Sequence, residues 1–412
     1  MLQTRPANAA LQSTAVACLA AIAYVDPGNF AVNVAAGAQH GYGLVWVVLA
    51  ASAAASLVQF LAAKLGVATG MSLAENCSER YRRGVWILLG VQAEVAVVMT
   101  DLAELVGGAF ALNMLVGLPM VTGAVLVAAF GFVVLGVRRR GGELFRPVLL
   151  GLFAIIVAAL LYQAVVAGVD VRALLRGAVP GRLDGSAALV SVGIIGATVM
   201  PHALHFHSAV SRTDAHLPLA ARRRSARRRS RAGLALARSR TAYGVAVAMT
   251  LAGAANVSIV LVATHLPAAA GESLFLAHAE LAQVGGRVAA ALFAIALLAS
   301  GLASTTVGIY TGQVVMAGFW RWSVPVWVRR ALAAVPPLVL LVLGLDATRA
   351  LVLSQVALSF VLPASLVPLV LLTRRRSVMG DLVNHPVTSV AATLVTAVII
   401  GLDGYLLLTA LP

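Results

Sequence analysis

Two short polar breaks interrupt otherwise apolar segments, and the side chains in them have the chemistry of metal ligands. The first reads Asp-Pro-Gly-Asn at 26–29, and the second reads Ala-Thr-Val-Met-Pro-His at 197–202. A proline inside a membrane helix frees backbone groups, which lipid cannot satisfy, so such a break must be packed in protein or line a polar cavity. A carboxylate, an amide and a thioether together suit a transition-metal ion better than an organic solute.

Asp26 is the expected anionic ligand. A carboxylate at the middle of a membrane costs roughly 3 kcal/mol or more and indicates function by default. Asn29 follows at a spacing that lets the two side-chain oxygens converge across an unwound turn. The alternative is that Asp26 only caps a helix at a proline break.

Met200 is the expected soft ligand. Buried methionine usually fills space, but this one precedes Pro201 and mirrors the first break. A thioether discriminates against Ca²⁺ and Mg²⁺ and admits Mn²⁺, Fe²⁺ and softer ions. The carbonyls of Ala23 and Ala197 lie one turn before Asp26 and Met200, so unwinding would leave both oxygens free to coordinate.

Three acidic residues are expected to share one face of a membrane helix. Glu94 and Asp101 are seven residues apart, and Glu104 follows three residues later. At 100° per residue, Asp101 lies about 20° from Glu94, and Glu104 lies about 60° further round. This carboxylate stripe predicts a path for protons or cations.

The other polar residues near the breaks divide into two groups. His202 can exchange protons near neutral pH and is expected to serve the same path. His205 and His207 are expected to be structural, because an offset of about 500° turns His207 to another face. Asn256 and Gln355 are expected to bond between helices, and Gln355 is the better ligand candidate of the two.

The composition predicts a helical membrane protein. Of 412 residues, 61% are hydrophobic and 11% are charged, against about 25% charged in aqueous domains. Eleven apolar stretches approach the roughly 20 residues that span a bilayer, and the first is too long for a cleavable signal peptide. They are 13–36, 44–66, 85–112, 115–137, 146–168, 187–211, 241–264, 287–315, 329–346, 350–372 and 387–410.

The basic residues predict orientation rather than binding of nucleic acid. With the N-terminus in the cytoplasm, most of the 30 basic residues fall inside, including an arginine-rich loop predicted at 212–240. The positive-inside rule therefore places the N-terminus inside and the C-terminus outside. The basic residues that fall outside are Arg172, Arg176, Arg182, Arg287 and Arg349.

The chain is expected to be one transmembrane domain built from two repeats. Five spans at 13–168 and five at 187–372 place Asp26 and Met200 near the middle of the first and sixth. An odd number of helices inverts the second unit, which is the LeuT-type inverted-repeat arrangement. The span at 387–410 is an addition.

On these residues the chain resembles the NRAMP family of divalent metal transporters, its bacterial members in particular. The resemblance covers residues 15–410 and includes the two breaks, Asp101-Leu-Ala-Glu104 and Leu353-Ser-Gln355. It implies a LeuT-type fold in the bacterial plasma membrane and proton-linked import of Mn²⁺ or Fe²⁺, with Cd²⁺ also carried. It implies no enzyme activity and no prosthetic group, and a monomer is plausible.

The resemblance also implies roles for individual residues. The metal ligands would be Asp26, Asn29 and Met200, with the Ala23 or Ala197 carbonyls and, in some states, Gln355. The proton route would include His202, Asp101 and Glu104, with Arg329 and Arg330 near its cytoplasmic exit. The chain departs from the family's usual pattern at Thr241–Gly244, in the arginine-rich loop and at His205.

The sequence leaves two alternative functions to consider. A cation-coupled carrier of organic solutes on the same fold would bind a substrate carboxylate at helix N-termini, where Asp26 would repel it. A membrane metalloenzyme would use His202, His205 and His207, but it needs several histidine clusters near a membrane face, and the sequence has one cluster at mid-depth.

Overall fold

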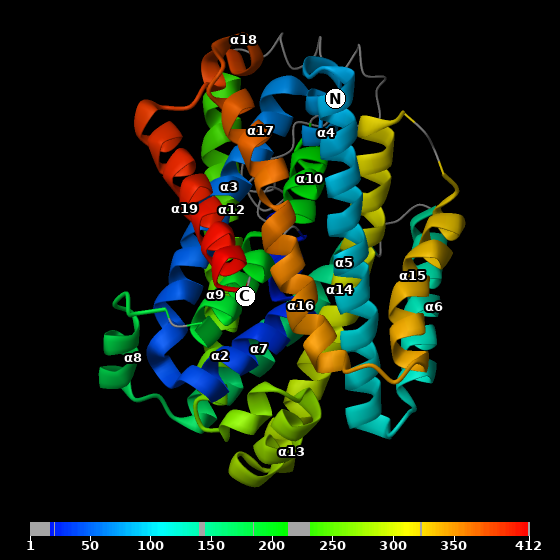
Figure 1. The fold of residues 1–412 in the computed structure, drawn as a ribbon. Coiled ribbons are helices and arrows are strands. Elements are labelled where there is room, and N and C mark those ends of the chain that lie inside the picture. The colour runs from blue at the N-terminus through cyan, green and yellow to red at the C-terminus, as the bar shows by residue number, and fades with distance from the viewer. Residues whose placement is uncertain are drawn as a thin grey trace.

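The protein is a bundle of helices. The computed structural model describes residues 17–19, 21–139, 145–183, 185–212, 231–321 and 324–410, and the regular secondary structure in these residues is helical (Figure 1). Helices satisfy their own backbone hydrogen bonds, as a chain with so much apolar sequence in lipid requires. The all-helical class expected from the composition is confirmed.

The first half of the chain runs from the first break to a short helix after α7. Its elements are η1 (Ile22–Val25), α2 (Pro27–His40), η2 (Gly41–Leu44), α3 (Val45–Thr69), α4 (Leu73–Arg80), α5 (Arg83–Val116), α6 (Met120–Arg139), α7 (Phe145–Ala167) and α8 (Val171–Gly177).

The second half contains the second break and ends in a long helix. Its elements are α9 (Gly185–Val199), α10 (Pro201–Val210), α12 (Arg231–Ala263), η3 (Ala268–Gly271), α13 (Leu274–Val284), α14 (Gly286–Phe319), α15 (Val326–Val342), α16 (Ala347–Val361), α17 (Pro363–Thr373), α18 (Arg376–Met379), η4 (Gly380–Leu382) and α19 (Pro386–Ala410).

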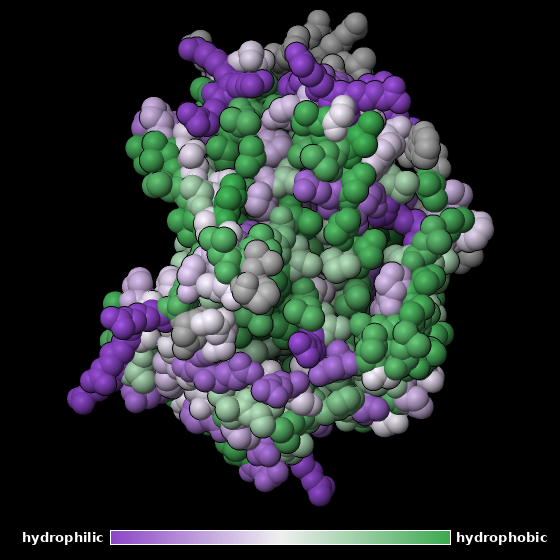
Figure 2. All heavy atoms as spheres, in the orientation of Figure 1, coloured by the Kyte–Doolittle hydropathy of each residue, from purple (hydrophilic) through white to green (hydrophobic). Residues whose placement is uncertain are grey.

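By length and composition, the described residues contain 8 candidate membrane spans, fewer than the eleven apolar stretches of the sequence. One candidate, Pro27–Thr69, joins α2 and α3 across η2. The described apolar part of α6 is only Met120–Val133, and α15 has 17 residues. Hydrophilic residues gather at the two ends of the molecule, and hydrophobic side chains dominate the face between these ends (Figure 2).

Both polar breaks interrupt their helices at the expected residues. The 3-10 turn η1 ends at Val25, Asp26 is extended, and α2 begins at Pro27. In the second half α9 ends at Val199, Met200 leaves helical geometry with φ 3° and ψ 113°, and α10 begins at Pro201. Proline suits the first position of a helix because its missing N–H has no partner there in any case.

The predicted boundary of the arginine-rich loop is wrong on one side. Residues 213–230 lie outside the described part, but α12 already begins at Arg231, whereas the loop was expected to continue to residue 240. The segment 231–240 is rich in Ala, Leu and Arg, which are strong helix formers, so it extends the helix beyond its apolar stretch.

Two long helices, α5 and α14, pack along each other in the centre of the bundle (Figure 1). The helices around them pack in matched pairs. Helix α2 packs on α12 as α10 packs on α3, and α5 packs on α16 as α14 packs on α7. Such matched contacts are those that a repeated five-helix unit would make.

A glycine lets the helix that precedes the second break approach α16 closely. A Cβ atom on Gly196 would lie 1.9 Å from the backbone oxygen of Gln355 and 2.7 Å from the nitrogen of Ser359. Neither backbone atom can move aside as a side chain could. Gly196 therefore fixes the distance between α9 and the helix that carries Gln355.

This close approach predicts that Gly196→Ala destabilises the protein. Overpacking a close contact costs about 1–3 kcal/mol, which exceeds the helix propensity that alanine gains over glycine. Gly151→Ala in α7 is the control, because a Cβ atom there meets open space. Thermal unfolding of the purified proteins should show a lower midpoint for Gly196→Ala alone. Equal midpoints would show that α9 and α16 have room to spare.

Candidate functional site

Asp26 caps a helix and still keeps one oxygen free. Its Oδ1 atom accepts hydrogen bonds from the backbone nitrogen of Asn29 at 2.8 Å and from Asn29 Nδ2 at 2.9 Å. Its Oδ2 atom is buried and has no hydrogen-bond partner in the described part of the chain. The capping alternative is therefore correct for one oxygen, and the other is available to a cation.

Asn29 joins the two breaks. Its Nδ2 atom, besides bonding Asp26, donates to the backbone oxygen of Ala197 at 2.9 Å, and its Oδ1 atom accepts from Thr198 Oγ1 at 3.4 Å. The partly positive NH₂ group thus bridges two oxygens that are both predicted ligands. A half-turn of the amide would present its oxygen to a cation in the same place.

Neighbouring helices hold the carbonyls that the first break exposes. Asn256 of α12 donates from Nδ2 to the oxygen of Tyr24 at 2.8 Å, and Ser300 of α14 donates to the oxygen of Val25 at 2.5 Å. Asn256 Oδ1 also accepts from Asn33. Asn256 therefore bonds between helices, as expected, and it satisfies backbone that lipid could not.

Met200 and Gln355 lie in the same buried region as the breaks. Both side chains have 0% exposed surface. A Cβ atom on Gly28 would lie 2.1 Å from Gln355 Nε2, so the amide rests directly on the first break. Gln355 Nε2 donates to Ser354 at 2.9 Å, and its Oε1 atom has no partner among the described residues.

The carboxylate stripe of α5 faces two arginines of α15. Arg329 holds Glu94 with two hydrogen bonds, at 2.7 and 3.1 Å, and Arg330 bonds Asp101 at 3.2 Å. Glu104 is fully buried, and neither of its oxygens has a hydrogen-bond partner within the described ranges. The stripe therefore has two paired acids and one acid without a partner.

Helix α14 leaves room for these acids, and α5 connects them to both breaks. A Cβ atom on Gly308 would lie 3.0 Å from Glu104 Oε1 and 3.3 Å from Asp101 Oδ1. One turn beyond Glu104, a Cβ atom on Gly107 would lie 2.0 Å from Pro27 Cβ. One residue before Asp101, Thr100 Oγ1 lies 3.0 Å from Nδ1 of His202, next to the second break.

The charges in this region do not balance. The stripe and Asp26 together make four carboxylates. Only two guanidinium groups of the described residues lie beside them, and these bond Glu94 and Asp101. Asp26 and Glu104 remain without a basic partner in the described structure. In a low-dielectric interior two such negative charges must be neutralised, and either two protons or one divalent cation would do so.

The three histidines turn toward different helices. His205 Nε2 lies 3.3 Å from Ser365 of α17, and its ring packs edge-on against Phe319. His207 Nδ1 lies 2.6 Å from Gln59 of α3, which in turn bonds the hydroxyl of Tyr24. No group of three or more His, Cys, Asp or Glu residues within metal-binding reach occurs among the described residues. The structural reading of His205 and His207 agrees with this geometry.

Sequence reasoning missed several buried polar residues. Asp403 in α19 accepts a 2.7 Å hydrogen bond from Ser359, one turn beyond Gln355. Its position within an apolar stretch was the signal that could have found it. Lys64 bonds Asn384 in the segment before α19. Tyr24, Gln59, Thr100 and Ser300 carry no charge, and nothing in their sequence context separates them from ordinary core positions.

Comparison with known sequences identifies relatives along nearly the whole chain. The sequence model of the natural resistance-associated macrophage protein-like (Nramp) family matches residues 17–409. The divalent metal cation transporter MntH of Yersinia pestis is 40% identical over 406 residues, which cover 96% of this chain and 94% of that protein. The MntH protein of Aeromonas hydrophila is 39% identical over 396 residues, with 95% and 94% covered.

Solved transporter structures are similar to this fold along nearly the whole chain. A crystal structure of a mutant Eremococcus coleocola manganese transporter has a TM-score of 0.82 and 27% identity, and the match covers 96% of this chain and 85% of that one. Mhp1, a nucleobase-cation-symport-1 family transporter, has a TM-score of 0.59 at 16% identity, and the match covers 96% of this chain and 93% of Mhp1. The likeness to Mhp1 concerns the fold alone.

The buried pair of Arg330 and Asp101 predicts a distinct pattern of stability. Arg330→Met would leave Asp101 buried without its partner, which costs about 3–5 kcal/mol. Adding Asp101→Asn should restore more than half of that loss, because the stranded charge is then gone. Arg329→Met, whose partner Glu94 is 27% exposed, should cost less. Thermal unfolding of the parent and these three variants tests this, and a double variant no more stable than Arg330→Met would contradict it.

Proposed function

The chain belongs to the Nramp family and is a divalent metal cation transporter, and on that premise we propose that it imports Mn²⁺ or Fe²⁺ together with protons. Cd²⁺, a softer ion, would be carried as well. The ions are substrates, and no prosthetic group is needed. The ligands would be Asp26, Asn29 and Met200, with the carbonyl of Ala197 or Ala23 and, in some states, Gln355.

One observation carries this proposal: the Asn29 amide links the carboxylate of Asp26, which keeps its other oxygen without a partner in the described residues, to the second break. Asn29 bonds both Asp26 and the Ala197 carbonyl, so ligand atoms from α2 and α9 already converge. Turning one amide would replace its N–H donors with an acceptor. The result would be a site of three oxygens beside a thioether, which suits Mn²⁺ and Fe²⁺.

The charge imbalance supports coupling to protons. Protons would neutralise Asp26 and Glu104 when no metal is bound, and a divalent ion at Asp26 would displace them. Thr100 and His202 lie between the second break and the stripe, so a proton leaving Asp26 would have acceptors nearby. Glu94, Arg329 and Arg330 would form the end of the route that opens toward the cytoplasm.

We propose eleven spans in two inverted repeats, about 13–168 and 187–372, in one domain with an extra helix at 387–410. The matched helix contacts described above support the repeat. The N-terminus would be cytoplasmic and the C-terminus outside in a bacterial plasma membrane, with the loop after α10 inside. The basic segments at α4 and α18 lie at one end of the bundle, and α8 and α13 lie toward the other (Figure 1). A monomer would suffice for this site.

Removing the carboxylate tests the site directly. Asp26→Ala should lower Mn²⁺ uptake into proteoliposomes by more than about tenfold, since neutral ligands cannot replace the one anionic ligand in a low-dielectric site. Asp346→Ala is the matched control, because Asp346 caps α16 in the same way but at an exposed position. Near-normal uptake by Asp26→Ala, with the control unaffected, would remove Asp26 from the site.

Removing the thioether should change selectivity more than rate. Met200→Ala loses the soft ligand and leaves space for water, so competition by Ca²⁺ or Mg²⁺ should rise and Cd²⁺ uptake should fall most. Met249→Ala, another buried methionine, supplies the control. Uptake of Mn²⁺ would be measured with each competitor. Unchanged rejection of Ca²⁺ by Met200→Ala would assign the filter to other residues.

The proton route predicts three variants with a shared effect. Asp101→Asn, Glu104→Gln and His202→Ala should each reduce acidification of the vesicle interior more than they reduce Mn²⁺ affinity. Their combined effect should be smaller than the sum, because groups on one route share a path. Asp403→Asn, a buried acid on another helix, is the control. Normal proton flux in all three variants would leave the stripe with a structural role only.

A further inference from the structure

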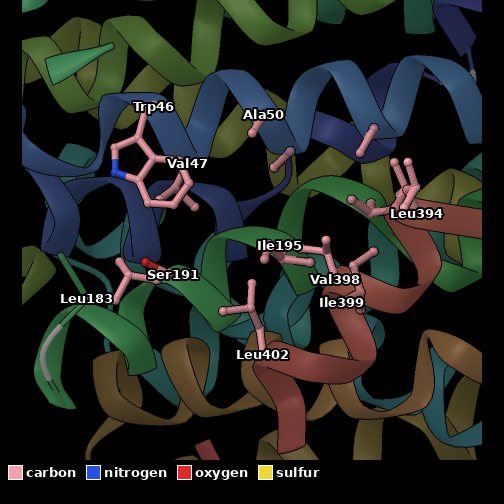
Figure 3. A pocket seen from close by; sticks show the side chains of 14 residues that line it. Trp46, Val47, Ala50, Leu183, Ser191, Ile195, Leu394, Val398, Ile399 and Leu402 are labelled. Atoms are coloured by element: carbon pink, nitrogen blue, oxygen red, sulfur yellow. The ribbon is translucent and has the colours of Figure 1, made fainter. Parts of the chain in front are cut away.

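An apolar cavity lies between α3, α9 and α19. Its volume is about 240 Å³. Helix α3 contributes Ala51 and Ala54, α9 contributes Ile195, and α19 contributes Val398 and Leu402. Figure 3 shows these apolar side chains directed toward one another from the three helices. A cavity lined in this way stays dry and accepts apolar groups.

One end of this cavity carries two polar atoms without partners. Ser191 is fully buried, and neither its Oγ atom nor Nε1 of Trp46 has a hydrogen-bond partner in the described part of the chain. Both residues line the cavity at the end away from Leu394 (Figure 3). Tryptophan near the end of a membrane helix ordinarily turns its N–H toward water or head groups. Here the N–H is buried and has no acceptor among the described residues.

The opposite rim faces the surroundings of the protein. Leu394 and Val398 of α19 are 60% and 58% exposed, and both line the cavity. In a membrane protein the surroundings of such apolar side chains are acyl chains. The cavity is therefore open to lipid at its apolar rim.

The cavity has room for part of one acyl chain. A cavity of about 150 Å³ holds a benzene ring, so about 240 Å³ would hold about ten carbon atoms. A drug-sized ligand needs at least about 300 Å³. An ester carbonyl at the hydrocarbon boundary would supply the acceptor that Ser191 and Trp46 lack.

We propose that this cavity binds one acyl chain of a membrane phospholipid, whose ester oxygen accepts hydrogen bonds from Trp46 and Ser191. The acyl chain would run from Trp46, at the start of α3, toward Val199 at the end of α9. Val199 precedes Met200, so the lipid would support the helix that ends at the second break. The binding itself is independent of metal transport.

Fluorescence of Trp46 tests the proposal. In a protein where Trp86, Trp320, Trp322 and Trp327 are replaced by Phe, phospholipid brominated on its acyl chains should quench Trp46. Quenching should reach a plateau while brominated lipid is still a minor component. Ala54→Phe, which fills the cavity, should abolish the plateau. Ala53→Phe, an exposed neighbour outside the cavity, should retain it.

Quenching that rises in proportion to brominated lipid in all these proteins would reflect bulk lipid and would overturn the proposal. A second measurement needs none of the four Trp→Phe replacements. Native mass spectrometry of protein in mild detergent should detect one retained phospholipid. Ala54→Phe should lose it, Trp46→Phe and Ser191→Ala should retain less of it, and Ala53→Phe should match the parent. Equal retention in Ala54→Phe and Ala53→Phe would contradict the proposed site.

Discussion

The interior of the bundle buries two carboxylates, Asp26 and Glu104, that have no basic partner among the described residues. An unneutralised charge in a low-dielectric interior is very costly. Neighbouring Glu94 and Asp101 each have an arginine, so the imbalance is local and specific. A protein that keeps two such acids needs cations to neutralise them. Protons and a divalent metal ion are two ways to meet the same requirement, and the proposed coupling uses both: a metal ion that arrives at Asp26 would release its proton toward the carboxylate stripe.

The two breaks are stable because other helices satisfy them. Hydrogen bonds from Asn256 and Ser300 occupy the carbonyls of Tyr24 and Val25, and the bond from Asn29 to Ala197 joins one break to the other. Glycines at 28, 107 and 196 allow side chains and backbone to approach closely. The site is thus held by neutral hydrogen bonds and close packing. The ion would add the missing positive charge without having to order the backbone.

The sequence predicted the breaks, the stripe and the direction of the histidines because each depends on a local rule: proline in a helix, charge in an apolar stretch, and 100° per residue. It could not predict that one oxygen of Asp26 would cap α2 while the other stays without a partner among the described residues, since that depends on how the two breaks pack together. Asp403 was not predicted, although a carboxylate within an apolar stretch indicates a polar contact in the interior. The start of α12 at Arg231 was not predicted, because residues 231–240 favour a helix but are not hydrophobic enough to belong to the apolar stretch.

Anomalous diffraction from crystals of the protein soaked in Mn²⁺ shows directly whether Asp26 binds the metal. We expect one strong peak within direct coordination distance of Asp26 and Asn29, with Met200 beside it and the Asn29 amide turned so that its oxygen faces the ion. A strongest peak between Asp101 and Glu104, with none at Asp26, would contradict it. The metal would then bind in the carboxylate stripe, and the two breaks would not form the metal site.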